Sequence, residues 1–223
     1  MNYTLIRSRR KTAVIYLRGD TLEVRAPLHM PKWYIDKFVA SREEWIIDKL
    51  AWAREQARRR DSFTLGYGDM IFYRGKQYPI VAKCVNRAVF ADQRFYIPPD
   101  LAPEQIKAAC IKIYRMLAKR DLTEKTACFA KRMMVMPAAV KVNNAKARWG
   151  SCSSKKSLNF SWRLVMAEDD IIDYVVVHEL AHITEMNHSS RFWVIVKGVL
   201  PDYQERRVKL KELQHRLSGE DWG

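Results

Sequence analysis

The stretch of residues 173–193 limits the fold more than any other part of the sequence, because it gathers three of the five histidines. Residues 178–182 read H-E-L-A-H. Side chains four positions apart share one helical face, so His178 and His182 can both reach an ion at about 2.0–2.1 Å if this stretch is a helix. Glu179 then lies beside the first ligand, where a general base is needed. The sequence therefore predicts a Zn²⁺ site on a helix.

A third protein ligand is needed if the fourth position of the zinc ion is to hold water. Two downstream residues are candidates, Glu185 and His188. Glu185 shares the helical face but lies about 10 Å along the axis from the first ligand, at 1.5 Å per residue. Asn187 tolerates a left-handed conformation and would stop the helix, so that His188 can turn back toward the ion. We favour His188 and keep Glu185 as the alternative.

The chain is strongly basic, with 40 Lys+Arg against 25 Asp+Glu in 223 residues and a net charge of +15. The excess is divided evenly, +8 in residues 1–100 and +7 in residues 101–223, so it is not a tail. Basic domains often bind DNA or RNA, because phosphate contacts release counterions. A basic surface without such a partner has the same composition. Both interpretations stay open at this point.

Composition also limits the class of protein and the compartment in which we expect it. A 48% share of hydrophobic residues is enough for a globular core. No apolar run approaches the roughly 20 residues of a membrane-spanning helix, and we expect no signal peptide. The four cysteines form no C-x-x-C pair, which favours reduced thiols. We therefore expect a cytoplasmic protein that does not span a membrane.

The N-terminal part alternates between strand and helix patterns. Three β-rich runs and a turn at Gly19-Asp20 predict an antiparallel meander, with strands over residues 3–7, 11–17 and 22–25. Ser41 and Glu44 form a capping-box pattern, which predicts the start of a helix that continues to Arg60. This part is therefore β-rich, with helices near residues 31–60.

The rest of the chain returns to strands and then to a long helix. Strand signals recur over residues 70–73, 77–83, 88–90 and 94–97, and Pro98–Asp100 is typical of a boundary. Helical spacing over residues 103–134 predicts one helix, or two joined near Asp121, and a strand follows over residues 139–143. We predict an α+β fold with regions 1–100 and 101–223 that pack as one compact unit.

Five short motifs occur together in the second region: RWGSCS at 148–153, LNFSWRL at 158–164, DYVVVHELAH at 173–182, NHS at 187–189 and RFW at 191–193. Together they resemble the YgjP-like metallopeptidases, which are predicted metal-dependent hydrolases of the zincin group. The SprT-type proteases, which act on proteins crosslinked to DNA, are more distant relatives, and we do not carry their substrate over.

The resemblance implies a zincin-like catalytic domain over residues 101–223, with the active-site helix packed on a small sheet. It implies His178, His182 and His188 as zinc ligands and Glu179 as the general base. In zincins an edge strand beside the metal pairs with the extended substrate backbone. Asn159 lies on a polar face of such a strand pattern and is a candidate substrate contact. The alternative is an ordinary hairpin packed on the helix.

Three functions fit the sequence. The first is a zinc-dependent metallopeptidase acting on a protein or peptide substrate, which a basic surface would deliver to nucleic-acid-associated proteins. The second is a basic protein that binds DNA or RNA, recognisable by steep salt dependence. The third is a non-catalytic zinc adaptor. The presence of Glu179 counts against the adaptor, because a purely structural zinc site needs no general base.

Overall fold

The computed structural model describes residues 2–18 and 21–223. The fold is α+β, as predicted, with helices and mixed sheets. Two compact units are present: Met1–Phe63 with Leu217–Asp221 and Gly223, and Thr64–Arg216 with Trp222. The division therefore falls at Phe63–Thr64, earlier than the Pro98–Asp100 boundary expected from the sequence. No helix among the described residues is long and apolar enough to cross a bilayer.

The first unit begins with a mixed sheet, formed by β1 (Thr4–Ser8), β2 (Val14–Arg18) and β3 (Thr21–Pro27) in the order β1-β3-β2. β2 and β3 are antiparallel, but β1 pairs with β3 in parallel, so the predicted meander is wrong. The Arg7 guanidinium donates to the carbonyl oxygens of Pro27, Leu28 and Met30, which holds the end of β1 beside the end of β3. The predicted Gly19-Asp20 turn lies outside the described residues.

Two helices cover this sheet, α1 (Lys32–Ala40) and α2 (Glu43–Asp61). The predicted capping box does not form, because Ser41 ends α1 and its Oγ donates back to the Phe38 carbonyl. Arg42 is instead the N-cap of α2. The core of the unit is small and joins both helices to the sheet; its fully buried side chains include Ile35, Val39, Ile46, Val24 and Ala26.

The second unit begins with a four-stranded sheet of β4 (Met70–Tyr73), β5 (Lys76–Ala82), β6 (Val89–Ala91) and β7 (Arg94–Ile97), in the order β4-β5-β7-β6. It packs on α3 (Pro103–Arg132), which is one continuous helix. The buried Asp121 carboxylate accepts hydrogen bonds from the Tyr73 hydroxyl at 2.6 Å and from Arg120 Nε at 2.8 Å. The hydrogen bond from Tyr73 of β4 to Asp121 of α3 joins the sheet to the helix, so the strands of residues 70–97 belong to the second unit.

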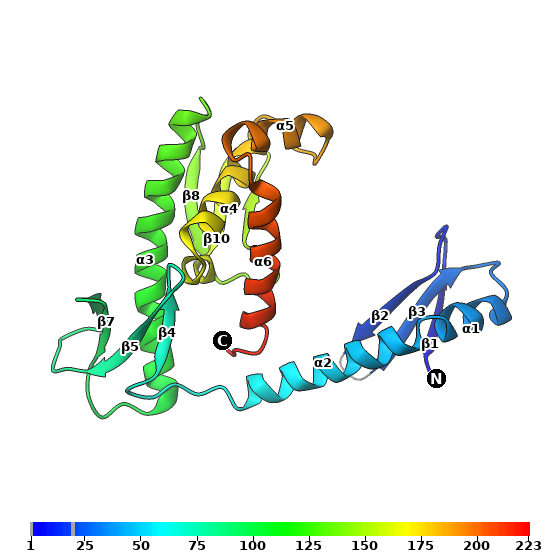
Figure 1. The fold of residues 1–223 in the computed structure, drawn as a ribbon, viewed down its shortest axis with the longest axis horizontal. Coiled ribbons are helices and arrows are strands. Elements are labelled where there is room, and N and C mark those ends of the chain that lie inside the picture. The colour runs from blue at the N-terminus through cyan, green and yellow to red at the C-terminus, as the bar shows by residue number, and fades with distance from the viewer. Residues whose placement is uncertain (1, 19–20) are drawn as a thin grey trace. The chain divides into compact units, whose positions relative to one another are not determined.

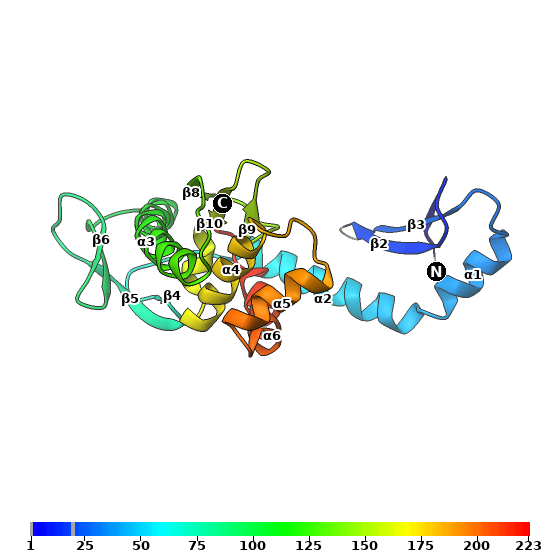
Figure 2. The ribbon, with the colours of Figure 1, turned by 90° about the horizontal axis from the view of Figure 1, so that it is seen from above.

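A second sheet of three strands follows α3: β8 (Ala139–Asn143), β9 (Gly150–Cys152) and β10 (Ser157–Ser161), in the order β8-β10-β9. The 3-10 helix η1 (Trp162–Met166) leads to α4 (Asp169–Ala181), α5 (Ser190–Val199) and α6 (Tyr203–Leu217). In both views α4 lies between α3 on one side and α5 and α6 on the other (Figures 1 and 2). Fully buried Trp162 stacks on Tyr114 with ring centroids 5.5 Å apart, in the core that supports α4.

Candidate metal centre

The N-terminus of α4 is anchored by ion pairs to three other segments. Asp169 and Asp170 occupy the first turn, where negative charge complements the helix dipole. Arg74 donates to both oxygens of Asp169 at 2.8 Å, and Lys209 of α6 donates to Asp170 at 2.7 Å. Lys125 of α3 donates to Asp173 at 2.5 Å, one turn further along. These contacts fix the helix on which the H-E-L-A-H residues lie.

The C-terminus of α4 comes earlier than expected. The helix ends at Ala181 with His182 as its C-cap, and the predicted stop at Asn187 is wrong. Asn187 is not among the residues with positive φ. The chain turns because the Glu185 carbonyl bonds the His182 Nδ1 at 3.1 Å, while the Glu185 amide donates to the Ala181 carbonyl at 3.0 Å. This turn carries residue 188 back beside the helix.

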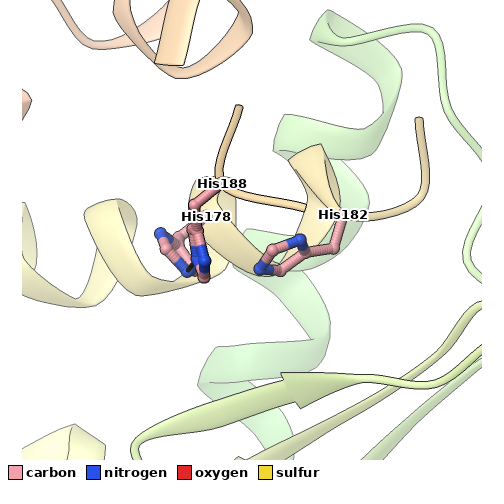
Figure 3. A group of neighbouring side chains, drawn as sticks. All are labelled: His178, His182 and His188. Atoms are coloured by element: carbon pink, nitrogen blue, oxygen red, sulfur yellow. Dashed lines mark hydrogen bonds between the residues drawn. The ribbon is translucent and has the colours of Figure 1, made fainter. Parts of the chain in front are cut away.

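The three histidine side chains of this region converge (Figure 3). One ring nitrogen from each of His178, His182 and His188 lies within 4.8 Å of the others. The Nε2 atoms of His178 and His188 are 3.0 Å apart. The Glu185 side chain does not belong to this group, so of the two candidate third ligands the structure brings only His188 to the other two.

The ring nitrogens are in a state that suits metal binding. A carbonyl oxygen only accepts, so His182 Nδ1 carries the proton that bonds Glu185, and its Nε2 keeps a lone pair. Burial, with smaller effects of His182, His188 and Arg207, lowers the pKa of His178 to about 3. Burial also lowers the pKa of His182. Neutral imidazoles are the form that binds metals, so the donor set fits a divalent cation such as Zn²⁺.

Aromatic rings hold the histidine rings from behind. Phe192 is fully buried, and its ring centroid lies 4.6–4.9 Å from those of His178, His182 and His188. Trp193 stacks on His188 at 5.8 Å, and Tyr203 of α6 stacks on Trp193 at 5.3 Å. The stack restricts the rotation of the most exposed of the three imidazoles.

Glu179 is buried against β9. Only 6% of its surface is exposed, and burial raises the pKa of its carboxyl to about 7, against a smaller opposing effect of Arg148. A Cβ atom at Gly150 would lie 2.6 Å from Glu179 Cγ and 2.7 Å from its Oε1. Real Cβ atoms do not come so close, so Gly150 is the residue type that lets the carboxylate occupy this position.

A small cavity opens beside the carboxylate. It has a volume of about 150 Å³, and its walls are mainly aromatic and aliphatic; they are formed by Trp149, Gly150, Tyr174, Val175, His178, Glu179 and Leu210. Neither Gly150 nor Leu210 was predicted from the sequence to belong to the site. A lone glycine and a leucine on a later helix carry no local signal of their part in the site.

Asn159 is not brought to the histidines. It lies on the central strand β10, where its neighbours are Lys141 of β8 and Ser151 of β9. Gly150, which faces Glu179, pairs instead with Phe160. Successive side chains of a strand point to opposite faces, so the register places Asn159 on the sheet face away from Glu179. Its Oδ1 is buried and has no hydrogen-bond partner among the described residues.

Comparisons with known proteins find a matching family and similar solved structures. The sequence profile described as "YgjP-like, metallopeptidase domain" matches residues 11–213. The chain is similar to abylysin of Pyrococcus abyssi, a metallopeptidase zymogen, with 21% identity and a TM-score of 0.37 over 40% of this chain and 93% of that chain. It is also similar to the zymogen of jannalysin of Methanocaldococcus jannaschii, with 19% identity and a TM-score of 0.38 over 41% and 95% of the two chains. A search of curated proteins finds no match.

Proposed function

The chain belongs to the YgjP-like family of metallopeptidases, and we propose that it is a zinc-dependent peptidase in which His178, His182 and His188 hold the metal. The family makes it a metal-dependent hydrolase of protein or peptide substrates. The observation that carries the proposal is the convergence of three imidazole nitrogens, together with the buried carboxylate of Glu179, which lines the same small cavity as His178.

His178, His182 and His188 would hold the zinc ion, and a site with three protein ligands keeps room for a water molecule. The bound ion would polarise the scissile carbonyl and lower the pKa of that water to about 7. Glu179 takes the proton of the attacking water and passes it to the leaving amine. The packing of Glu179 on Gly150 holds its carboxylate in place for both transfers.

The surroundings of Glu179 suggest how substrate is held. β9 is an edge strand of its sheet and contacts α4, so an extended substrate backbone can pair with it by strand addition. The cavity beside Glu179, with a volume of about 150 Å³, then takes an aliphatic side chain next to the scissile bond. Asn159 stays a predicted substrate contact, supported by its unpaired Oδ1 alone.

A structural zinc site fits less well. Such sites usually have four closed protein ligands, often cysteines. Among the described residues the group contains three histidines only, and none of Cys84, Cys110, Cys128 and Cys152 joins it. A net charge of +15 favours nucleic acid as an additional partner rather than as a replacement for the peptidase function.

The decisive experiment combines metal content with proteolysis. We expect about one zinc per chain by elemental analysis, and hydrolysis of an unfolded protein such as reduced casein. Glu179→Gln should retain zinc and lose about 10²- to 10⁴-fold in kcat, the usual contribution of a general base. Glu185→Gln is the matched control and should retain both. Unchanged hydrolysis by Glu179→Gln contradicts the proposal.

A further inference from the structure

The positive charge of the second unit is concentrated in one segment. Residues 125–167 contain nine Lys and Arg side chains and no Asp or Glu. They form the end of α3, the whole β8-β10-β9 sheet and η1. The net charges of the two halves of the chain are nearly equal, +8 and +7, so they do not indicate this segment.

Three of these cations are already used within the fold. Lys125 pairs with Asp173, Arg132 donates to the Val199 carbonyl, and buried Arg163 donates to Asn144. The other six are exposed and form no ion pair with any described carboxylate: Lys131, Lys141, Lys146, Arg148, Lys155 and Lys156. Their charge is therefore available to a partner.

An open groove between α3 and β8 extends this charge. The basic groove has a volume of about 480 Å³ and is lined by Arg115, Lys119, Lys141, Val142 and Asn143, with no acidic side chain in its wall. Lys119 Nζ donates to the Val140 carbonyl at 3.0 Å, which fixes its position at the edge of the sheet. The stretch of α3 from Gln105 to Arg120 also lacks any Asp or Glu.

Further cations lie at both ends of β8. Lys155 and Lys156 lie in the turn beside its first residues, where the Ala138 amide donates to the Lys156 carbonyl at 2.9 Å. Lys146 lies in the loop that follows its last residue, Asn143. The five residues of β8 span about 16 Å, which is the axial rise of about five nucleotides of one strand.

From this arrangement we infer that the basic groove and the cations flanking β8 bind the sugar-phosphate backbone of nucleic acid. A row of unpaired cations along about 16 Å matches an anion whose charges repeat. Arginine and lysine at the wall contact phosphate oxygens directly, since Arg115 can bind one bidentately and Lys119 retains further donors. The inference does not depend on the peptidase function.

The test compares two triple variants of the full-length protein with equal charge. The groove variant is Arg115→Gln, Lys119→Gln and Lys141→Gln, and the control is Lys76→Gln, Lys197→Gln and Lys211→Gln, which lie outside the groove. Fluorescence anisotropy measures binding of a labelled 20-nucleotide DNA of mixed sequence, single-stranded or duplex, between 50 and 200 mM NaCl. Circular dichroism confirms that both variants are folded.

We expect the groove variant to weaken DNA binding at 50 mM salt by at least about tenfold and to make the slope of log K against log salt shallower by about 2–3. The control should bind within about twofold of wild type. The inference is overturned if wild type does not bind DNA, if both variants lose affinity equally, or if poly-glutamate of similar length binds as tightly as DNA. Binding is read without any proteolysis, so failure here and failure of the peptidase proposal are distinguishable.

Discussion

β8 and β9 are the two edges of one sheet, and their surroundings differ in burial and in charge. On the β9 side, Gly150 packs against Glu179 of the buried helix α4, and the Glu179 side chain is almost fully shielded from water. On the β8 side, Lys141 lies in an open groove with two cations of α3. The central strand β10 separates the two sides.

The difference follows from what burial does to charge. A buried charge is costly, so burial favours the neutral form of an ionisable group. It therefore raises the pKa of Glu179 and lowers that of His178. Exposed cations keep their charge and act over about 10 Å in solution. One small sheet therefore has a buried carboxylate beside one edge strand and exposed cations beside the other.

The largest effect should come from the third histidine. His188→Ala should weaken zinc binding by more than about 100-fold. Mutating a residue that only hydrogen-bonds to a metal ligand already lowers metal affinity by about 10- to 100-fold, and this variant removes a ligand itself. Competition with a chromogenic chelator measures this affinity. Glu185→Ala is the control, because its backbone carbonyl still bonds His182. Equal losses for both variants would mean that the site on the β9 side is assembled differently.

Gly150→Ala should reduce kcat/KM by about 100-fold. The new Cβ would overlap the Glu179 side chain and displace its carboxylate, and a catalytic group displaced by about 1 Å can lose about 100-fold in rate. Ser151→Ala, on the next residue and the opposite face, should change it by less than about twofold. Zinc content should stay unchanged in both. A similar loss of kcat/KM in the two variants would show that the effect does not depend on which face of β9 the new side chain occupies.

Leu210→Ala should change substrate preference by about tenfold, because it enlarges the cavity beside Glu179. The ratio of kcat/KM for peptides with Phe and with Val beside the scissile bond should rise. Val208→Ala, at an exposed position of the same helix, is the control. An unchanged ratio would show that substrate side chains do not enter this cavity.

The smallest effect concerns the anchoring of α4. Burial raises the pKa of Asp169, but Arg74 and Lys125 outweigh it and hold this pKa below its ordinary value. The resulting stability is present above the unfolded-state pKa of about 3.9 and is lost as pH falls through the folded-state pKa. Asp169→Asn should therefore lower the free energy of unfolding at pH 7 by less than about 1 kcal/mol, since the pair is half-exposed.

Urea unfolding at pH 7 and at a pH below the unfolded-state pKa of about 3.9 measures this difference, which should be smaller at the lower pH because the Asp169 carboxyl takes up a proton as the pH falls. Glu212→Gln is the control for removing one exposed carboxylate. A constant difference at both pH values would assign the effect of Asp169→Asn to packing rather than to charge.

Local patterns predicted the elements well. The strands at 70–73, 94–97 and 139–143 are confirmed, as is a single helix over most of residues 103–134. Their apolar spacing reflects which side chains each element buries on its own. The spacing of His178, His182 and His188 also predicted the cluster, because the helix and the turn after it are set by nearby residues.

What the sequence did not predict depends partly on partners far along the chain and partly on local contacts that compete with one another. The parallel pairing of β1 with β3 and the face of Asn159 are set by register between strands. Ser41 had two possible local uses, as the start of one helix or the end of another, and the structure uses the second. The end of α4 depends on a ring-to-carbonyl bond of His182. The segment without acidic residues, 125–167, coincides with the β8-β10-β9 sheet and its flanks, which the net charges of the two halves of the chain do not indicate.

The attachment of the three imidazoles also has a consequence for exchange kinetics. His178 belongs to a helix packed in the core, whereas His188 is exposed in a short turn between α4 and α5. Segments with few buried contacts open far more often than the core. Amide hydrogens of residues 184–188 should therefore exchange much faster than those of residues 174–181. We expect the opening of this turn, rather than global unfolding, to limit how long the three imidazoles stay together.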